Sequence, residues 1–393
     1  MFKLIILSTN EEKQWRGLLD GYKHQSPHYL PEYLSVYENE KNRDSFSHFG
    51  GQGTLAVYGD SSNFIIYPFF VRSISNLPFS VPSTDDLHDI VSPYGYGGPL
   101  AQIEDWAIYK ELWTGFFETF DRFCRESKIV SEFCRLQPIL GNYQPVADFS
   151  HGVVQQLGQI VYVDLSRSEE EIFTGMAKGH RRHTRRTLEN PDLQLCFEKE
   201  ERYFQSFFYL YTETMQKVGA HKKYYFSQDF FDRVFRTMGN HLGFSYVIYQ
   251  GEIITVLLTL TYGYQTYSWL SGTKNKYYQL HPNTALIYKS FLQAKRAGSK
   301  YFILGGAASG SQSLFEFKAG FSELRKDFYV YKKIHLKEQY EKLVELQGYE
   351  DKVNGEFFPQ YRLHEEVPDD YTTKRSGVKW ENRMAGEGDL VKN

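Results

Sequence analysis

Cysteine and net charge are both scarce in this sequence, and each shortage excludes classes of protein. Only three of the 393 residues are cysteine. They form no C-x-x-C pair, so neither a disulfide framework nor a zinc site is indicated. The 45 Lys and Arg residues nearly balance the 48 Asp and Glu residues, giving a net charge of -3. That balance argues against a general nucleic-acid coat protein. We therefore expect reduced cysteines, a cytoplasmic location and, for any bound anion, a local site.

Long apolar runs and common catalytic signatures are missing as well. No stretch reaches the ~18 uninterrupted apolar residues that a membrane helix needs, and the apolar run at residues 4–7 is too short for a secretion signal. We find no nucleophile elbow, kinase signature or dinucleotide-binding G-x-G-x-x-G pattern. The loop at residues 305–311 has the glycine spacing of a P-loop but lacks the lysine that would reach nucleotide phosphates. We therefore expect no membrane span and no P-loop nucleotide chemistry.

Aromatic residues are abundant, with 31 Tyr and 31 Phe in a chain that is 41% hydrophobic. This supply is ample for sizeable cores, and the length indicates two domains. We predict residues 1–159 and 160–340 as the domains and 341–393 as a polar, partly mobile tail. Local patterns predict a mixed α/β fold. The expected elements are a tyrosine-rich loop at 22–37, a strand pair at 55–60 and 63–71, helices at 103–127, 168–190, 203–218 and 284–297, and strands at 160–165, 244–250, 252–263, 265–273 and 301–304.

The segment at residues 298–321 carries the clearest chemical signal. A buried strand at 301–304 is expected to lead into a glycine-serine loop with Gly305 and Gly306, and then into a turn rich in phenylalanine that contains Phe317 and Lys318. A lysine held among phenylalanines at a sheet-end cleft can stabilise negative charge at an acyl or phosphoryl centre. We therefore predict group transfer. The alternatives are a lysine that only extends its ammonium to solvent, and glycines that serve close backbone packing.

A second signal is a run of basic residues within the predicted helix at 168–190. At 100° per residue, five side chains fall within an arc of roughly 140°, namely Lys178, Arg181, Arg182, Arg185 and Arg186. Such a face is typical of a phosphate-binding site for a pyrophosphate, a nucleotide sugar or a tRNA end. A solvated helix face with acidic neighbours is the alternative. The surrounding arginines argue against metal binding by His180 and His183, and we expect no metal.

The loop SPYGYGGPL, at residues 92–100, contains two prolines and three glycines that exclude regular structure. It is expected to hold two tyrosines in fixed positions. Either these side chains contact a substrate or they pack in the protein interior, and the same alternatives apply to one tryptophan in a predicted strand. The candidate substrate-binding residues outside the lysine segment are Tyr94, Tyr96, Gly97, Gly98 and Trp269.

The order of these motifs resembles that of one family. They are IVYVDL at 160–165, GHRRHTRR at 179–186, three strands over 244–273, a helix over 281–298, LGG at 304–306 and FEFKAGF at 315–321. This succession resembles the second GNAT-like domain of the Fem family of peptidoglycan-bridge aminoacyltransferases. It is also similar to the BioF2-like acetyltransferase domain. Residues 1–159 resemble the family more weakly, through YGYGGP at 94–99.

The resemblance implies two tandem GNAT-like domains, with an acceptor cleft largely in the first and between the two. It implies transfer of an aminoacyl group from aminoacyl-tRNA, or of an acyl group from a thioester, to an amine. The family's FKxGF-like motif falls on Phe317 and Lys318, and its lysine assists the transferring carbonyl. No tightly bound cofactor is implied. The chain departs from the family in lacking room for a long helical hairpin that contacts tRNA, and in lacking the acetyl-CoA pyrophosphate loop.

Three functions therefore remain open. The first is transfer of an aminoacyl or acyl group to an amine of a cell-wall or surface-polysaccharide precursor, with charged tRNA as a candidate partner. The second is acyl-CoA-dependent N-acetylation of an amino sugar, such as a nucleotide sugar. The third is a non-catalytic GNAT-like module that binds a ligand. The donor, the acceptor and the oligomeric state are not determined by the sequence.

Overall fold

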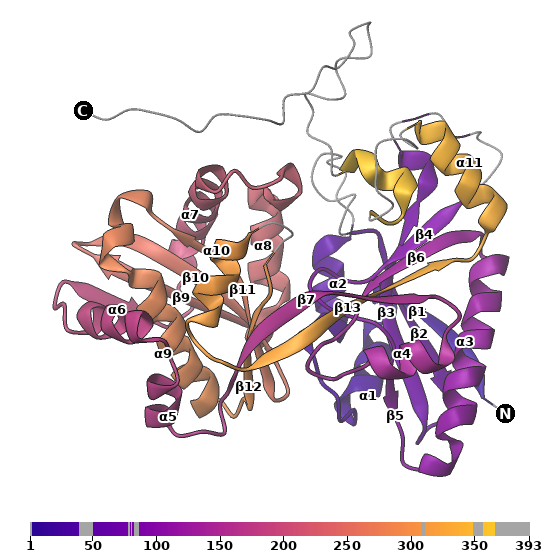
Figure 1. Cartoon of the computed structure of the whole chain (residues 1–393), viewed down its shortest axis with the longest axis horizontal. Coiled ribbons are helices and arrows are strands. Elements are labelled where there is room, and N and C mark those ends of the chain that lie inside the picture. The colour runs from indigo at the N-terminus through magenta and orange to yellow at the C-terminus, as the bar shows by residue number, and fades with distance from the viewer. Residues whose placement is uncertain are drawn as a thin grey trace, which may run out of the picture.

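The described strands form a single mixed sheet that runs through the whole molecule (Figure 1). This computed structural model describes residues 2–38, 50–77, 79, 81, 86–307, 311–348 and 357–365. The strand order is β1-β2-β3-β4-β6-β13-β7-β12-β11-β10-β9-β8, and β5 pairs with β3. The strands are β1 Lys3–Ser8, β2 Gln52–Gly59, β3 Phe64–Ser73, β4 His88–Val91, β5 Leu100–Gln102, β6 Ile129–Arg135, β7 Val153–Asp164, β8 Leu193–Cys196, β9 Leu242–Tyr249, β10 Glu252–Tyr262, β11 Gln265–Thr273, β12 Tyr301–Gly305 and β13 Arg325–Ile334.

Helices cover this sheet in both halves of the molecule (Figure 1). They are α1 Glu12–Asp20, α2 Pro31–Tyr37, α3 Tyr109–Glu126, α4 Tyr143–Phe149, α5 Glu169–Thr174, α6 Lys178–Leu188, α7 Phe204–Lys217, α8 Gln228–Thr237, α9 Pro282–Arg296, α10 Gln312–Ala319 and α11 Lys337–Gln347. We call β1–β6 with α1–α4 and α11 the first half, and β7–β12 with α5–α10 the second half. Strand β13 belongs to both halves, because it pairs with β6 and with β7. No helix among the described residues is both long and apolar enough to cross a membrane.

Several local predictions are confirmed. The pair β2 and β3 is antiparallel, as is the meander of β9, β10 and β11. The predicted helices at 103–127, 203–218 and 284–297 correspond to α3, α7 and α9, with ends shifted by a few residues. The strands β2, β3 and β10 are buried on both faces along most of their length, as continuous apolar runs indicate. The helices follow the 3.6-residue period of an amphipathic helix.

Three local predictions are wrong. The tyrosine-rich segment at 22–37 ends in a helix, α2, which begins at Pro31, because proline is pre-organised for the first helical position. The predicted turn around Lys318 is helix α10. The predicted helix at 168–190 is two helices, α5 and α6. It starts at Ser168 with a capping box to Glu171, as predicted, but it breaks before Ala177. There the Ala177 N–H donates to the Gly320 carbonyl at 2.8 Å, so a tertiary bond replaces a helical one.

The two halves are joined by β7 and β13, which lie side by side and run between the lobes in Figure 1. β13 pairs with β6 of the first half along one edge and with β7 along the other. A hydrophobic cluster also contains buried side chains from both halves, among them Trp15, Tyr33, Phe207 and Leu258. The predicted domain boundary, between residues 159 and 160, falls inside β7, and the division into domains stays a prediction.

Part of the predicted tail is anchored to the first half. Helix α11 continues past residue 341, where the tail was expected to begin. Further along, the Arg362 Nε lies 2.5 Å from Asp89, which also accepts from Arg72 at 2.8 Å and from the Tyr361 hydroxyl at 3.0 Å. Asp89 is fully buried, so its charge depends on these cations. Residues 349–356 and 366–393 of the predicted tail lie outside the described part of the chain.

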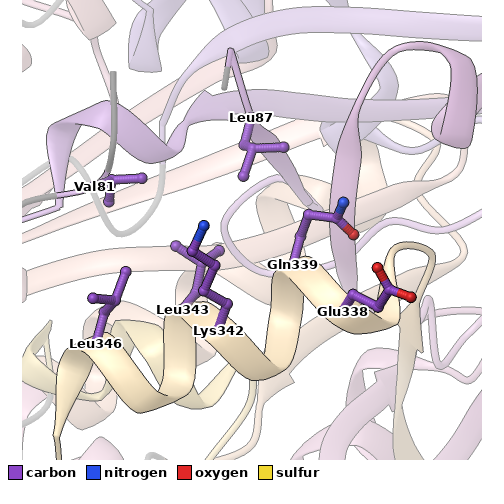
Figure 2. A pocket seen from close by; sticks show the side chains of 7 residues that line it. All are labelled: Val81, Leu87, Glu338, Gln339, Lys342, Leu343 and Leu346. Carbon is purple, nitrogen blue, oxygen red and sulfur yellow. The ribbon is translucent and has the colours of Figure 1, made fainter. Parts of the chain in front are cut away.

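A small pocket separates α11 from the chain before β4 (Figure 2). Its volume is about 180 Å³. Leu87 and Leu343 face each other across it, with Val81 and Leu346 at one end and polar side chains at the other. It lies in the first half, whereas the lysine helix α10 belongs to the second half (Figure 1).

A buried histidine connects three elements of the first half. His335 follows β13, and its side chain is only 1% exposed. Its Nδ1 lies 2.8 Å from the Asp121 carboxylate on α3, and its Nε2 lies 3.1 Å from the Glu132 carboxylate on β6. Burial alone would lower the pKa of His335, but the hydrogen bonds to Asp121 and Glu132 raise it above 6.5. The imidazolium therefore ties helix α3 to the sheet.

Replacing this histidine should change the pH dependence of stability. Because its folded pKa is raised, His335 contributes stability that is fully present below pH 6.5 and is lost as pH rises through the folded value. We expect His335→Gln to lower the free energy of unfolding by roughly 3–5 kcal/mol at pH 6, with a smaller loss at alkaline pH. Urea unfolding at several pH values measures this. The surface variant His151→Gln is the control, and a pH-independent loss for His335→Gln would contradict the assignment.

Candidate active site

The candidate site lies where two parallel strands stop pairing. β11 and β12 share only three residue pairs, the last of which joins Tyr267 to Ile303. Beyond this pair β11 continues to Thr273 and β12 to Gly305 without further pairing between them. Parallel strands leave loops and side chains at their carboxyl ends free to approach a ligand. The end of β12 is therefore open to a ligand and is the candidate site for group transfer.

Lys318 reaches this strand end from helix α10. Its ammonium donates to the carbonyl oxygen of Gly306, directly after β12. The side chain is half-buried, and burial lowers the pKa of Lys318 from 10.5 to about 8. Among the described residues, no carboxylate forms an ion pair with it. Its charge is thus poorly solvated and able to act strongly on a nearby anion.

Tyr96 reaches the same strand end from the first half. A Cβ atom on Gly305 would lie 3.3 Å from the Tyr96 hydroxyl and 3.7 Å from the Lys318 Nζ. Burial raises the pKa of the Tyr96 hydroxyl, and the backbone of Gly306 offsets part of this rise. Of the residues predicted to bind substrate, the structure therefore brings Tyr96, Gly305 and Gly306 together with Lys318. Gly305 has a φ of +76°, a conformation that L residues rarely adopt, and glycine leaves the space between the two polar groups open.

The ring of Tyr96 is held by three aromatic neighbours. Its centroid lies 5.4 Å from that of His28, 5.9 Å from that of Tyr267 and 5.7 Å from that of Phe328. His28 is 2% exposed, and burial lowers its pKa to about 3, so it is neutral. Its Nδ1 lies 3.0 Å from the Ser26 hydroxyl. A neutral, buried aromatic layer thus fixes the position of the tyrosine.

Helix α6 supports the lysine helix from the other side. The His180 Nε2 lies 2.9 Å from the carbonyl oxygen of Phe317, and the His180 ring packs edge-on against Phe321 at 4.5 Å. This ring also covers Gly320, where a Cβ atom would approach it to 2.3 Å. Only glycine allows α6 and α10 to lie this close. The backbone at Phe317 is therefore fixed by α6, next to the lysine.

The four predicted phosphate-binding residues all lie on α6. Arg181 is half-buried and donates to the Thr174 carbonyl, and the Arg185 guanidinium lies 5.2 Å from the Phe173 ring centroid. Lys178 and Arg182 are exposed. The Arg182 Nη2 also lies 3.4 Å from the His183 Nε2. Three arginines thus have partners within the protein, while the helix still presents a cationic face.

A cavity of about 400 Å³ lies between the end of α10 and the break that separates α5 from α6. Its walls carry both signs of charge. The basic side chains are those of Arg167 and Arg181, and the acidic ones are those of Asp164, Glu171 and Glu323. Because the acidic side chains offset the arginines, this cavity is not a simple anion site. It adjoins the lysine helix through Ala319 and Phe321, which also line it.

The remaining predicted substrate residues lie in the interior between the halves. Tyr94 and Trp269 pack against a shared aromatic cluster, where Trp269 lies 6.0 Å from Tyr33. Gly97 and Gly98 are buried, and their carbonyl groups accept hydrogen bonds from Asn142 and Tyr29 respectively. These glycines hold the loop in place, and the loop in turn positions Tyr96.

The sequence reasoning missed the residues that position the site. His28, Tyr267 and Gln137 had no recognisable signal, because their roles depend on contacts across the fold: the Gln137 Nε2 donates to the Tyr267 hydroxyl at 2.8 Å. His180 was considered only as a metal ligand. Within the described residues, no group of three His, Cys, Asp or Glu side chains is arranged to hold a metal ion.

Comparison with known proteins agrees with this geometry. A family model described as an acetyltransferase (GNAT) domain matches residues 175–319. The crystal structure of FemX matches with a TM-score of 0.61 at 10% sequence identity, covering 86% of this chain and 99% of that one. A conserved protein of unknown function from Bacteroides thetaiotaomicron matches with a TM-score of 0.50 at 11% identity, covering 84% and 99%. No curated protein matches the sequence.

These findings define the class of the fold. Residues 175–319 match an acetyltransferase (GNAT) domain, so this part of the chain is GNAT-like. The likeness to FemX shows a shared fold over most of the chain, so the prediction of a mixed α/β fold that resembles Fem-like proteins is confirmed.

The close approach of α6 and α10 can be tested by filling it. We expect Gly320→Ala to lower the free energy of unfolding by about 1–3 kcal/mol, because the new methyl group collides with the His180 ring. Thermal unfolding measures this. Gly17→Ala, at a helix position with nothing within 4 Å, is the control and should not destabilise. In a His180→Ala background the Gly320→Ala loss should largely vanish, and full additivity of the two changes would contradict the contact.

Proposed function

We propose that the protein transfers an aminoacyl or acyl group from an activated donor to an amine of a cell-wall or surface-polysaccharide precursor. The observation that carries this proposal is the half-buried Lys318 beside Gly305, Gly306 and Tyr96 at the end of β12. The GNAT match over residues 175–319 includes the lysine, which supports an acyl-transfer role for it. The acceptor amine is the part of the proposal that rests on the resemblance to Fem-like enzymes.

The reaction would proceed without a covalent enzyme intermediate. The acceptor amine attacks the ester or thioester carbonyl of the donor, and negative charge develops on the carbonyl oxygen. Lys318 stabilises this oxyanion and the leaving group, because a cation in a poorly solvated site interacts strongly with developing charge. Phe317 positions the lysine, and its own carbonyl is held by His180.

The cationic face of α6 would bind phosphate groups of the donor or the acceptor through Lys178, Arg181, Arg182 and Arg185. Its supporting observation is that this helix contacts α10 through His180, so a ligand on α6 lies on an element that positions the lysine helix. Arginine suits this role because its planar guanidinium matches phosphate oxygens in pairs.

The lysine can be tested by substitution and by pH. We expect Lys318→Ala to lower turnover on the order of 100-fold while leaving the melting temperature unchanged. In the wild type, turnover should fall as pH rises through about 8, because Lys318 then loses its proton. Steady-state kinetics from pH 6 to 10 measures both effects. The exposed Lys326→Ala is the control, and normal turnover by Lys318→Ala would exclude the proposed role.

The donor can be identified by a screen of the purified protein. Labelled aminoacyl-tRNA and acyl-CoA are supplied separately, with amine acceptors of cell-wall and nucleotide-sugar type. We expect amide formation with one donor class and its loss in Lys318→Ala. Transfer from charged tRNA would establish the aminoacyl reading, and transfer from acyl-CoA alone would establish N-acylation. Tight binding of an acceptor without transfer from either donor would instead favour a non-catalytic module.

The acyl-CoA alternative has its own support. The matching family model describes an acetyltransferase domain. In the described part of the second half, the consecutive helices α7 and α8 are short, with 14 and 10 residues respectively. Neither has the length expected of a hairpin that reaches along a tRNA. Protection of the protein by CoA against thermal unfolding would favour this donor.

A further inference from the structure

Two polar side chains from different halves meet at the end of β12. The Lys318 ammonium and the Tyr96 hydroxyl both lie within 4 Å of the point where a side chain on Gly305 would begin. The Lys318 ammonium donates to the carbonyl of Gly306, and the Tyr96 hydroxyl lies next to the adjacent Gly305. The two glycines thus mark the point where both groups meet.

The Tyr96 hydroxyl is aimed by its ring, which cannot turn freely. Its three aromatic neighbours come from separate parts of the chain: His28 before α2, Tyr267 on β11 and Phe328 on β13. Tyr267 is itself fixed, because its hydroxyl accepts from Gln137 at 2.8 Å. A neutral phenol carries one O–H that it can donate. The environment therefore presents a rigid hydrogen-bond donor beside the lysine.

We propose that Tyr96 is a second catalytic hydrogen-bond donor. Together with Lys318, it binds the carbonyl oxygen of the substrate that supplies the aminoacyl or acyl group, as that oxygen becomes negatively charged. This role rests on the proposed function. During transfer a C–N bond forms between the acceptor amine and the carbonyl carbon, and the C–O or C–S bond to the leaving group breaks. The proton that the amine loses balances the proton that the leaving group takes up. Tyr96 donates a hydrogen bond throughout and does not change its own protonation.

The two hydrogen-bond donors, Lys318 and Tyr96, contribute to catalysis in different ways. The ammonium gives charge, whose effect depends on its remaining protonated, while the neutral phenol gives a directional hydrogen bond at any pH below its own ionisation. Burial raises the pKa of Tyr96, so the phenol stays protonated over the working range of the lysine. The first half of the molecule would therefore contribute directly to the chemical step, and the site would be incomplete without the loop at residues 92–100.

The test is Tyr96→Phe, which removes the hydroxyl and keeps the aromatic ring. With the donor identified by the screen, we expect kcat to fall 10- to 100-fold, while KM for donor and acceptor changes less than threefold and the melting temperature stays the same. The matched control is Tyr301→Phe at the opposite end of β12, which should leave kcat unchanged.

The possible results are distinct. A wild-type enzyme that transfers while Tyr96→Phe retains full kcat overturns this role alone. A raised KM with unchanged kcat also overturns it, because Tyr96 would then bind substrate without acting in the transition state. Absence of transfer by the wild type from every donor overturns the proposed function and this role with it.

Discussion

The whole site depends on the backbone pairing of one strand, β13, with partners in both halves. Val330 of β13 pairs with Arg135 of β6, and Arg325 near its start pairs with Val161 of β7, which in turn pairs with Gly305. Because hydrogen-bonded register is fixed in steps of one residue, these pairings set the distance between the loop at 92–100 and the end of β12. A tyrosine of the first half and a lysine of the second can meet only within this frame.

Close packing then fixes the lysine helix on this frame. Gly320 lets the His180 ring lie directly on α10, and His180 also contacts the Phe317 carbonyl. The same helix, α6, bears the basic side chains that are predicted to bind phosphate. The positioning of α10 and this positive charge therefore come from a single element. Partial burial lowers the pKa of Lys318, which keeps the ammonium near the balance between charged and neutral forms. Such a group is common at functional sites.

Local patterns predicted much of the fold, and the errors have a common cause. The strands β2, β3 and β9–β12 and the helices α3, α7 and α9 follow apolar runs or a 3.6-residue period, and these were recognised. Strand β13, which joins the halves, was not predicted. The break between α5 and α6 was missed because it is stabilised by a hydrogen bond from Ala177 to Gly320, more than 140 positions away. Helix α10 was taken for a turn because its glycine and serine neighbours suggested irregular structure. Long-range contacts decided both segments, as they often override local propensity.

The sequence by itself determined the class of the fold, part of the order of its elements, and the lysine and glycines at the end of β12. Those features are local, because strand patterns and motif spacing depend on residues that are neighbours in the sequence. Only the tertiary structure decided that Tyr96 joins Lys318, that neutral His28 lies behind it, and that α6 positions α10. The residues of each contact are far apart in the chain, and their approach depends on sheet register and side-chain packing, which no local pattern encodes.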